Sequence, residues 1–424
     1  MMLRRMVLAF TLLLCLPWAT IVQAQELLSK FQPYVSVKEE YNDNINLTAS
    51  NEKEDYITTI QPGIRFNNMS ERAGVDLDYA LGAVFYAKND DLNYISHKAS
   101  LNAKYLTDKH VSFYLKESFI RSDNPRELEY FTTVEENRQV LATRTERAIY
   151  WRNVVAPTVE YQFGAENRAG VNYRNNIYRT QSESGENSQE NFINPFFSYW
   201  FDKRNGVSLE YGLTFGDFEN DPDLTGHRAS VRYTNRISPR SSLFTEYAYS
   251  KRTFASPSDA DYDIHDPTIG ITYAFSPALT ASGQIGYFWA NPKTGDEESG
   301  LSYKGELAHL GRRTAFKLSL QGGYTEDFFT SENLGFSRYH RLIATLDHKL
   351  GTRLSVGCFG NLERAEYNNP EHDDTIWGIG GTASYLLLKW LKISLHVAHR
   401  ERRSNVDTYE YKENTAMLQL TATY

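Results

Sequence analysis

Cysteine is nearly absent from the sequence, and long apolar segments are missing beyond its N-terminus. Two cysteines in 424 residues exclude a disulfide-stapled domain and the paired-cysteine spacing of a zinc site. After the N-terminal region, no segment approaches the roughly 18 consecutive apolar residues of a membrane-spanning helix. The densest apolar patch, Tyr385–Leu391, is interrupted by Lys389. Basic residues are also fewer than acidic ones. The formal net charge of -8 argues against a nucleic-acid-binding protein, which should carry a basic stripe, so no nucleic-acid partner is expected.

The motifs of common hydrolases and nucleotide-binding enzymes are missing as well. The sequence contains no Gly-x-Ser-x-Gly, no His-Glu-x-x-His and no phosphate-binding loop. Its ten histidines are scattered, and none stands in a recognisable pattern with a serine and a carboxylate. We therefore predict that the protein is not an enzyme and has no catalytic residues, no cofactor and no metal site. A catalytic constellation that only folding brings together remains the alternative.

One acidic stretch deserves separate consideration as a cation site. Carboxylates alternate at Asp217, Glu219, Asp221 and Asp223, and carboxylate oxygens are the ligands that Ca²⁺ prefers. The stretch lacks the glycine and glutamate positions of a dedicated calcium loop. We therefore favour an ordinary solvated acidic loop.

The N-terminus has the three parts of a secretory signal peptide. Arg4 and Arg5 precede an apolar run over Met6–Val22, and small residues precede a cleavage site after Ala24. We predict a signal peptide over residues 1–24 and a mature protein over residues 25–424; an uncleaved anchor is the alternative. Since one cysteine leaves with the signal, Cys358 is alone and no intramolecular disulfide is expected.

Aromatic residues are abundant, and side chains alternate in character along many short segments. Aromatics make up 14% of the chain, and 29 residues are Tyr, which favours β-structure. Between residues 72 and 87, Val75, Leu77 and Tyr79 alternate with Asp76 and Asp78. This period of two places alternate side chains on opposite faces of a strand. Around residues 110–121 the pattern is imperfect, because Glu117 falls on the apolar face, and a bulge or loop boundary is expected there.

Connections between these segments alternate between short and long in strict succession. Short polar joints fall near 67–71, 106–109, 164–166, 202–205, 238–240, 276, 310–312, 351–352 and 388–389; long ones include 42–55, 122–147, 179–190, 217–225, 254–263, 326–337 and 402–409. Tight turns on one side and long loops on the other are typical of outer-membrane barrels. The sequence therefore predicts an all-β, transmembrane, antiparallel up-and-down barrel of about 20 strands, with 18 as the alternative. A soluble β-sandwich or propeller fits less well, because the strands are long and no blade-like repeat is visible.

The ends of the predicted strands carry aromatic residues, as interfacial girdles require. They include Phe66, Tyr105, Tyr161, Phe163, Tyr273, Phe275 and Tyr424. The chain ends on Tyr424, after apolar residues at alternate positions. This ending is similar to the signal that the barrel-assembly machinery of Gram-negative bacteria recognises. We predict the Gram-negative cell outer membrane as the location, and outer-membrane lipid and that machinery as partners.

The first mature segment resembles a known family. Residues 32–45 read Gln-Pro-Tyr-Val-Ser-Val-Lys-Glu-Glu-Tyr-Asn-Asp-Asn-Ile, and residues 58–64 read Thr-Thr-Ile-Gln-Pro-Gly-Ile. A short strand ending in Tyr-Asn-Asp-Asn before such a segment resembles the opening of the putative beta-barrel porin family of proteobacterial outer membranes. The motif covers residues 32–64, whereas the architecture is similar over the whole mature chain. Members are often encoded with exopolysaccharide biosynthesis genes, so the resemblance implies polysaccharide export, with polysaccharide and periplasmic export components as partners. The family carries no agreed catalytic residues.

If the apolar strand faces contact lipid, the other faces form the wall of a lumen. The candidate wall residues are Asp76, Asp78, Lys98, Lys104, Glu160, Arg174, Glu210, Arg228, Arg232, Glu246, Lys304, Glu306 and Lys392. Both signs of charge occur, which suits a water-filled channel for a bulky polar solute such as a glycan. An ordinary ion-paired wall without selectivity is the alternative. Inward aromatics at Tyr114, Phe288 and Phe359 are expected either to stack on sugar rings or to pack against an inserted loop.

The longest predicted loop, 122–147, is expected either to fold inward and constrict the pore or to remain a solvated surface loop. We predict an outer-membrane barrel that exports exopolysaccharide. A general diffusion porin for small polar solutes and a plugged structural or adhesive barrel are the alternatives. These three functions differ in bore and occlusion rather than in motif.

Overall fold

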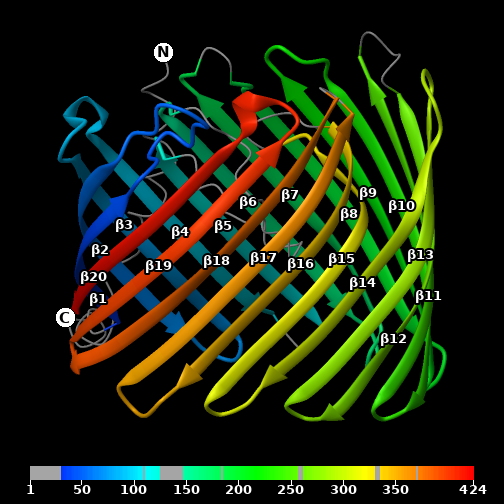
Figure 1. Ribbon diagram of the computed structural model, residues 1–424. Coiled ribbons are helices and arrows are strands. Elements are labelled where there is room, and N and C mark those ends of the chain that lie inside the picture. The colour runs from blue at the N-terminus through cyan, green and yellow to red at the C-terminus, as the bar shows by residue number, and fades with distance from the viewer. Residues whose placement is uncertain are drawn as a thin grey trace, which may run out of the picture.

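The protein is a closed β-barrel. The computed structural model describes residues 30–107, 110–124, 147–182, 185–255, 261–329, 335–368 and 371–424. Their strands form one antiparallel sheet of 20 strands, in which each strand pairs with its neighbour in sequence and β1 pairs with β20 (Figure 1). The prediction of about 20 strands is confirmed. The predicted signal peptide lies outside the described residues.

The strands cover most of the described chain. Their bounds are β1 Phe31–Asn42, β2 Asp55–Met69, β3 Ala73–Tyr86, β4 Tyr94–Leu106, β5 Val111–Ser122, β6 Tyr150–Gln162, β7 Arg168–Thr180, β8 Ser188–Trp200, β9 Asn205–Phe218, β10 Leu224–Ser238, β11 Ser241–Phe254, β12 Tyr262–Ser276, β13 Leu279–Pro292, β14 Glu298–Leu310, β15 Thr314–Asp327, β16 Gly335–Lys349, β17 Leu354–Asn368, β18 Glu371–Leu388, β19 Leu391–Ser404 and β20 Tyr411–Thr423. Two short 3-10 turns, η1 (Asp90–Leu92) and η4 (Asp407–Tyr409), lie in the connections. No helix among the described residues is long and apolar enough to cross a membrane.

The two faces of the sheet carry different side chains. Outward positions hold large apolar side chains that remain exposed, such as Ile269 on β12 and Ile285 on β13, with exposed fractions of 53% and 54%. The positions between them hold small or polar side chains, of which Ser250 and Ser302 are buried. A water-soluble sandwich would place its apolar faces in a core. An exposed apolar outer face instead fits contact with lipid chains.

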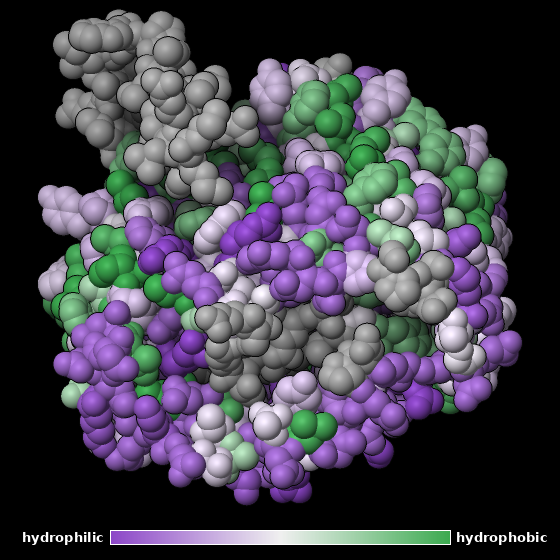
Figure 2. Space-filling model, turned by 90° about the horizontal axis from the view of Figure 1, so that it is seen from above, coloured by the Kyte–Doolittle hydropathy of each residue, from purple (hydrophilic) through white to green (hydrophobic). Residues whose placement is uncertain are grey.

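Short turns and long loops lie at opposite ends of the barrel. Turns such as 70–72, 239–240 and 311–313 lie at the lower end in Figure 1, together with the C-terminus. The upper end, shown from above in Figure 2, carries the long connections, and hydrophilic residues cover much of the described part of this face. The expected strict succession is wrong at one place. The β17–β18 connection on the loop side spans only 369–370, because β18 is extended to 18 residues.

One short turn shows how the sequence specifies these joints. Asp202 follows β8, and its Oδ1 accepts the backbone N–H groups of Arg204 and Asn205 at 2.6 and 2.9 Å. The side-chain amide of Asn205 donates to Oδ2 at 2.8 Å. This last hydrogen bond, with the two backbone donors, holds the pKa of Asp202 below its usual value. An aspartate that binds its own backbone two residues on is a turn-forming device.

Aromatic residues gather on the outer surface at both ends of the strands. At the short-turn end, the rings of Phe163, Phe197, Tyr199 and Phe201 follow one another at centroid separations of 5.7, 6.3 and 5.2 Å. Nearer the loop end, outward tyrosine hydroxyls lie within hydrogen-bond distance of histidine Nδ1 atoms. Three of these pairs join adjacent strands, and the fourth joins β14 to β16 across Gly322 of β15. These pairs are Tyr79–His97, Tyr211–His227, Tyr247–His265 and Tyr303–His340. Rings with an apolar body and a polar tip suit the two membrane–water interfaces.

The expected irregularity at Glu117 is wrong. β5 pairs without a register shift with β4 and β6 along its whole length, and Glu117 lies opposite Leu101 and Val155. The strand therefore keeps its regular hydrogen bonds and places one carboxylate on the outer face.

Candidate functional site

The strand register places all 13 predicted wall residues on the inner face of the barrel. The assignment of that face rests on contacts between strands that are not neighbours. Arg228 of β10 donates to the hydroxyl of Tyr324 on β15 at 3.3 Å, a contact between strands five apart that lies on the inner side of the sheet. Residues that are paired in the ladder lie on the same face of the sheet. The inner face can therefore be followed from strand to strand, as from Arg228 to Ser250 on β11.

Several wall residues form ion pairs with neighbours that the sequence analysis did not single out. Asp78 binds Arg65 at 2.6 Å, Arg174 binds Glu190 at 2.7 Å, Glu306 binds Lys317 at 3.1 Å and Glu160 lies 3.7 Å from Arg168. Only Arg232 and Glu246 bind each other among the predicted residues. These pairs tie adjacent strands together from the inside.

Other wall residues keep their charge available to the lumen. Among the described residues, no hydrogen bond or ion pair engages the side chains of Asp76, Lys104, Glu210, Lys304 or Lys392. Both signs are present, so the inner wall combines a paired, structural set of charges with an unpaired set.

Towards the loop end, the inner wall is packed rather than open. Arg402 of β19 binds Asp374 of β18 at 2.6 Å, and both side chains are fully buried. Arg341 of β16 likewise binds Glu363 of β17, its direct ladder partner, with both side chains nearly buried. Buried charges are tolerated only when they are paired. This half of the wall is therefore covered by other parts of the protein.

One covering element is the upper part of the β15–β16 hairpin. The β14–β15 ladder ends at Tyr303 and Gly322, although β14 continues to Glu298 and β15 to Asp327. The β15–β16 ladder continues to the end of β15. The two strands of the hairpin thus separate from β14 together and turn into the barrel.

A pair of glycines marks the bend. Gly323 has a φ of +140°, a conformation that other residues rarely adopt. Beside it, the ring of Tyr303 covers Gly322, where an added Cβ would lie 2.4 Å from the ring. This bend was not predicted from the sequence, although the Gly-Gly dipeptide inside a strand pattern is a signal for one.

The hairpin docks on the inner face of the nearby strands β11–β13 through rings and charges. Tyr324 packs against Phe288 of β13 at a centroid distance of 5.1 Å and stacks on Phe336 of β16 at 5.9 Å. Glu326 accepts hydrogen bonds from Arg252 of β11 and from the hydroxyl of Tyr262 on β12, both at 2.8 Å. The upper part of β15 is thereby held on the lumen side of these strands.

The three inward aromatics therefore have different surroundings. Phe288 is buried in this contact and packs against the inserted hairpin. Tyr114 of β5 remains 38% exposed on the inner face, and Phe359 of β17 is partly exposed. Only the last two remain available to a solute.

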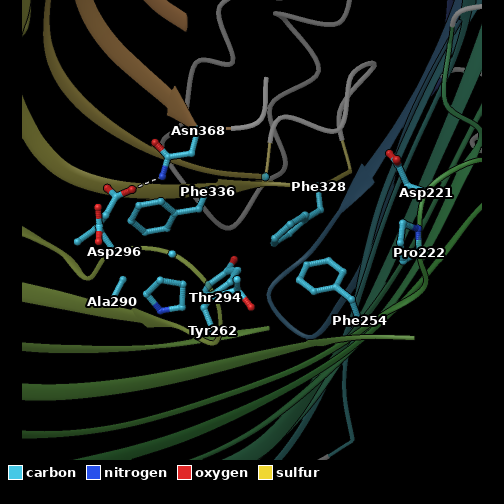
Figure 3. A pocket seen from close by; sticks show the side chains of 14 residues that line it. Asp221, Pro222, Phe254, Tyr262, Ala290, Thr294, Asp296, Phe328, Phe336 and Asn368 are labelled. Carbon is cyan, nitrogen blue, oxygen red and sulfur yellow. Dashed lines mark hydrogen bonds between the residues drawn. The ribbon is translucent and has the colours of Figure 1, made fainter. Parts of the chain in front are cut away.

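A cavity of about 550 Å³ lies beside the docked hairpin (Figure 3). The rings of Phe254, Tyr262, Phe328 and Phe336 line it together with the carboxylates of Asp221, Asp296 and Glu298. No described lining residue is cationic. This cavity thus has an aromatic and acidic lining.

The predicted constriction loop lies mostly outside the described residues, which omit 125–146. Its described flanks point inward. Arg147 donates to the carbonyl of Ile45 at 2.7 Å and to the hydroxyl of Tyr86 at 2.6 Å, and it pairs with Asp123 at 3.2 Å. Tyr86 is an inner-face residue of β3, so the base of this loop is anchored inside the mouth.

The acidic stretch at 217–223 divides between two elements. Asp217 is the last outward-facing residue of β9, whereas Glu219, Asp221 and Asp223 lie in the β9–β10 loop. One carboxylate oxygen of Asp223 accepts the N–H of Phe218 at 3.2 Å. Within the described part of the chain, no group of three or more histidine, cysteine or acidic side chains is arranged to hold a metal ion.

Tyr424, the predicted assembly signal, is 99% exposed at the short-turn end of β20. Its N–H donates to the carbonyl of Pro33 on β1 at 2.9 Å, so the C-terminus completes the closure of the sheet. The ring itself is left at the surface.

Comparison with known proteins gives a family and a fold. A family model described as putative beta-barrel porin 2 matches residues 213–424, which is half of the chain. The FrpB iron transporter from Neisseria meningitidis is similar in structure, with a TM-score of 0.55, 9% identity and coverage of 95% of this chain and 84% of that chain. The siderophore receptor PirA from Pseudomonas aeruginosa has a TM-score of 0.53 and 8% identity, covering 93% of this chain and 80% of that one. At such identities the likeness shows the fold alone. No protein of curated function matches.

Proposed function

Because the chain belongs to the family described as putative beta-barrel porin 2, we propose that it forms a pore in the Gram-negative outer membrane through which a polysaccharide is exported. The observation that carries this proposal is the inner wall of a closed sheet of 20 strands with unpaired charges of both signs. Barrels of about 16–18 strands already leave an aqueous channel. A barrel of this size therefore provides room for a hydrated polymer.

The wall chemistry supports a bulky polar solute. Charges of both signs along one wall give weak selection for small ions, whereas hydroxyl groups of a glycan find hydrogen-bonding partners of either kind. The exposed inner ring of Tyr114 adds an apolar face on which a sugar ring can stack. No wall residue is needed for chemistry, which agrees with the similarity to porins and transport receptors rather than to enzymes.

The ends of the barrel suggest how it is oriented and assembled. Short turns face the periplasm in barrels of this type, and long loops face outward. Periplasmic export components would then meet the short-turn end, and the barrel-assembly machinery would recognise the terminal aromatic, Tyr424. The docked β15–β16 hairpin would narrow the outer half of the path.

A strain that lacks the gene tests this function. The proposal predicts loss of extracellular polysaccharide and retention of the polymer in the periplasm, with recovery when the intact gene is supplied in trans. A strain that secretes normal amounts of polymer but loses uptake of small sugars would instead indicate a diffusion porin.

A further inference from the structure

The two ends of the barrel carry opposite charge. The described residues of the short turns include eight basic side chains and three acidic ones, in a chain that is acidic overall. The basic residues are Arg72, Lys203, Arg204, Arg240, Arg312, Arg313, Arg353 and Lys389. All of them are exposed. They come from six different turns, so they form a discontinuous basic ring around the short-turn mouth.

The long connections show the reverse balance. Their described residues include 15 acidic and four basic side chains. The cavity beside the hairpin continues this trend, since its described lining contains Asp296 and Glu298 and no cation. Net charge alone, at -8, conceals this polarity between the two mouths.

Two of the three acidic turn residues, Glu166 and Asp202, are already engaged, and the third, Glu71, directly precedes Arg72 in its turn. Glu166 is paired with Arg236 of β10 at 2.5 Å. Asp202 is occupied by the hydrogen bonds of its own turn. Neither carboxylate neutralises Arg312 or Arg313, which lie in a turn without acidic residues.

The positive charge continues into the lumen. Lys104, Lys349 and Lys392 stand on the inner face near the short-turn ends of β4, β16 and β19. Among the described residues, none of these three ammonium groups has a hydrogen bond or an ion pair. Two inner-face carboxylates, Asp76 and Asp347, lie at a similar distance from the short-turn end. The three ammonium groups therefore slightly outnumber the carboxylates there.

From this continuity we infer that the short-turn mouth captures a polyanionic saccharide, such as a uronic-acid polymer. The inference rests on the proposed export function and adds the charge class of its substrate. Anionic lipid headgroups or an acidic protein would satisfy the outer ring but would not reach Lys104 or Lys392 inside the barrel. A flexible polymer that threads the lumen contacts both sets. The acidic loop end then weakens binding at the exit, which assists release.

Single-channel recording of the intact protein in a planar bilayer tests the inference. The probe is an oligogalacturonate of about ten units, compared with a neutral maltodextrin of the same length. Electrostatic steering raises association rates and is screened by salt. We therefore expect the oligogalacturonate to block the current about tenfold more often than maltodextrin at low salt, only when added at the short-turn side, and to lose this advantage at high salt.

A charge reversal and a matched control locate the effect. Arg312→Glu combined with Arg313→Glu should reduce the oligogalacturonate association rate several-fold. Lys53→Glu combined with Lys293→Glu changes the same charge at the loop end and should leave that rate unchanged. Open-channel conductance and heat-modifiable migration in all variants report whether the barrel is folded.

The outcomes separate this inference from the function on which it rests. Equal capture of oligogalacturonate by the wild type and the Arg312/Arg313 variant, or equal capture of the neutral probe, would overturn the polyanion inference and leave the pore intact. A conducting channel that no saccharide blocks from either side would overturn the proposed export function itself.

Discussion

Adjacent residues on one strand face different solvents. On β12, Ile269 points outward, whereas Thr268 stands on the inner face, directly opposite Glu246 of β11. Both positions lie near the middle of the strand. A charged side chain placed at one position or the other is therefore exposed to lipid or to the lumen, although the two positions differ by a single residue.

Ile269→Arg should destabilise the folded barrel by about 2–4 kcal/mol, because a guanidinium near the bilayer midplane loses its hydration. Thr268→Arg places the same group beside the Glu246 carboxylate and should leave folding close to that of the wild type. Urea titration after refolding into lipid vesicles measures both. The same destabilisation in both variants would contradict the assignment of the two faces.

Tyr424→Asp should reduce the amount of barrel in the outer membrane while leaving synthesis and export to the periplasm intact. The exposed terminal ring contributes little packing to the fold, so the defect would arise in recognition during assembly. Tyr424→Phe keeps the aromatic ring and should assemble normally. Quantification of the barrel in outer-membrane fractions checks this. Normal levels of the Asp variant would show that the assembly machinery does not recognise the terminal ring.

The sequence allowed the face of each wall residue to be predicted, because strand side chains alternate with a period of two. It did not allow their partners to be predicted. Arg174 stands opposite Phe192 in the ladder and yet binds Glu190, two positions along the strand. Such a diagonal contact depends on register and rotamer, which no local pattern specifies.

The β15–β16 hairpin shows the same limit at the scale of elements. Side chains alternate along its strands as along the others, so both strands were expected to lie in the wall over their whole length. The separation from β14 depends on contacts distant in sequence, since Glu326 is 74 residues from Arg252 and 64 residues from Tyr262. The bend at Gly323 permits this conformation, whereas the docking contacts select it.

Tyr262→Phe combined with Glu326→Gln should loosen the docked hairpin. Hydrogen bonds to a charged group contribute roughly 1.5–3 kcal/mol, and both substitutions keep side-chain volume. The expected result is a higher mean conductance or more frequent openings in a planar bilayer. Tyr173→Phe removes an outward hydroxyl that bonds Asn191 at 2.8 Å and should leave conductance unchanged. Unaltered conductance in the double variant would show that the hairpin does not restrict the path.

At the scale of the whole molecule, length and connection pattern were sufficient to predict the architecture. Nine short joints, with the first strand beginning and the last strand ending on the same side, imply 20 strands, and closure through β1 and β20 confirms that number. The occlusion of the lumen was not predictable in the same way. Inward folding at Gly323, and the anchoring of Arg147 on Tyr86, arise from tertiary contacts within the mouth.

Release of polymer from proteoliposomes tests the export pore most directly. Vesicles that contain the purified barrel are loaded with fluorescently labelled exopolysaccharide from the producing strain and with a small labelled sugar. The account predicts that the polymer escapes through the protein and is retained by protein-free vesicles. Retention of the polymer while the small sugar escapes would contradict polysaccharide export and identify a diffusion porin.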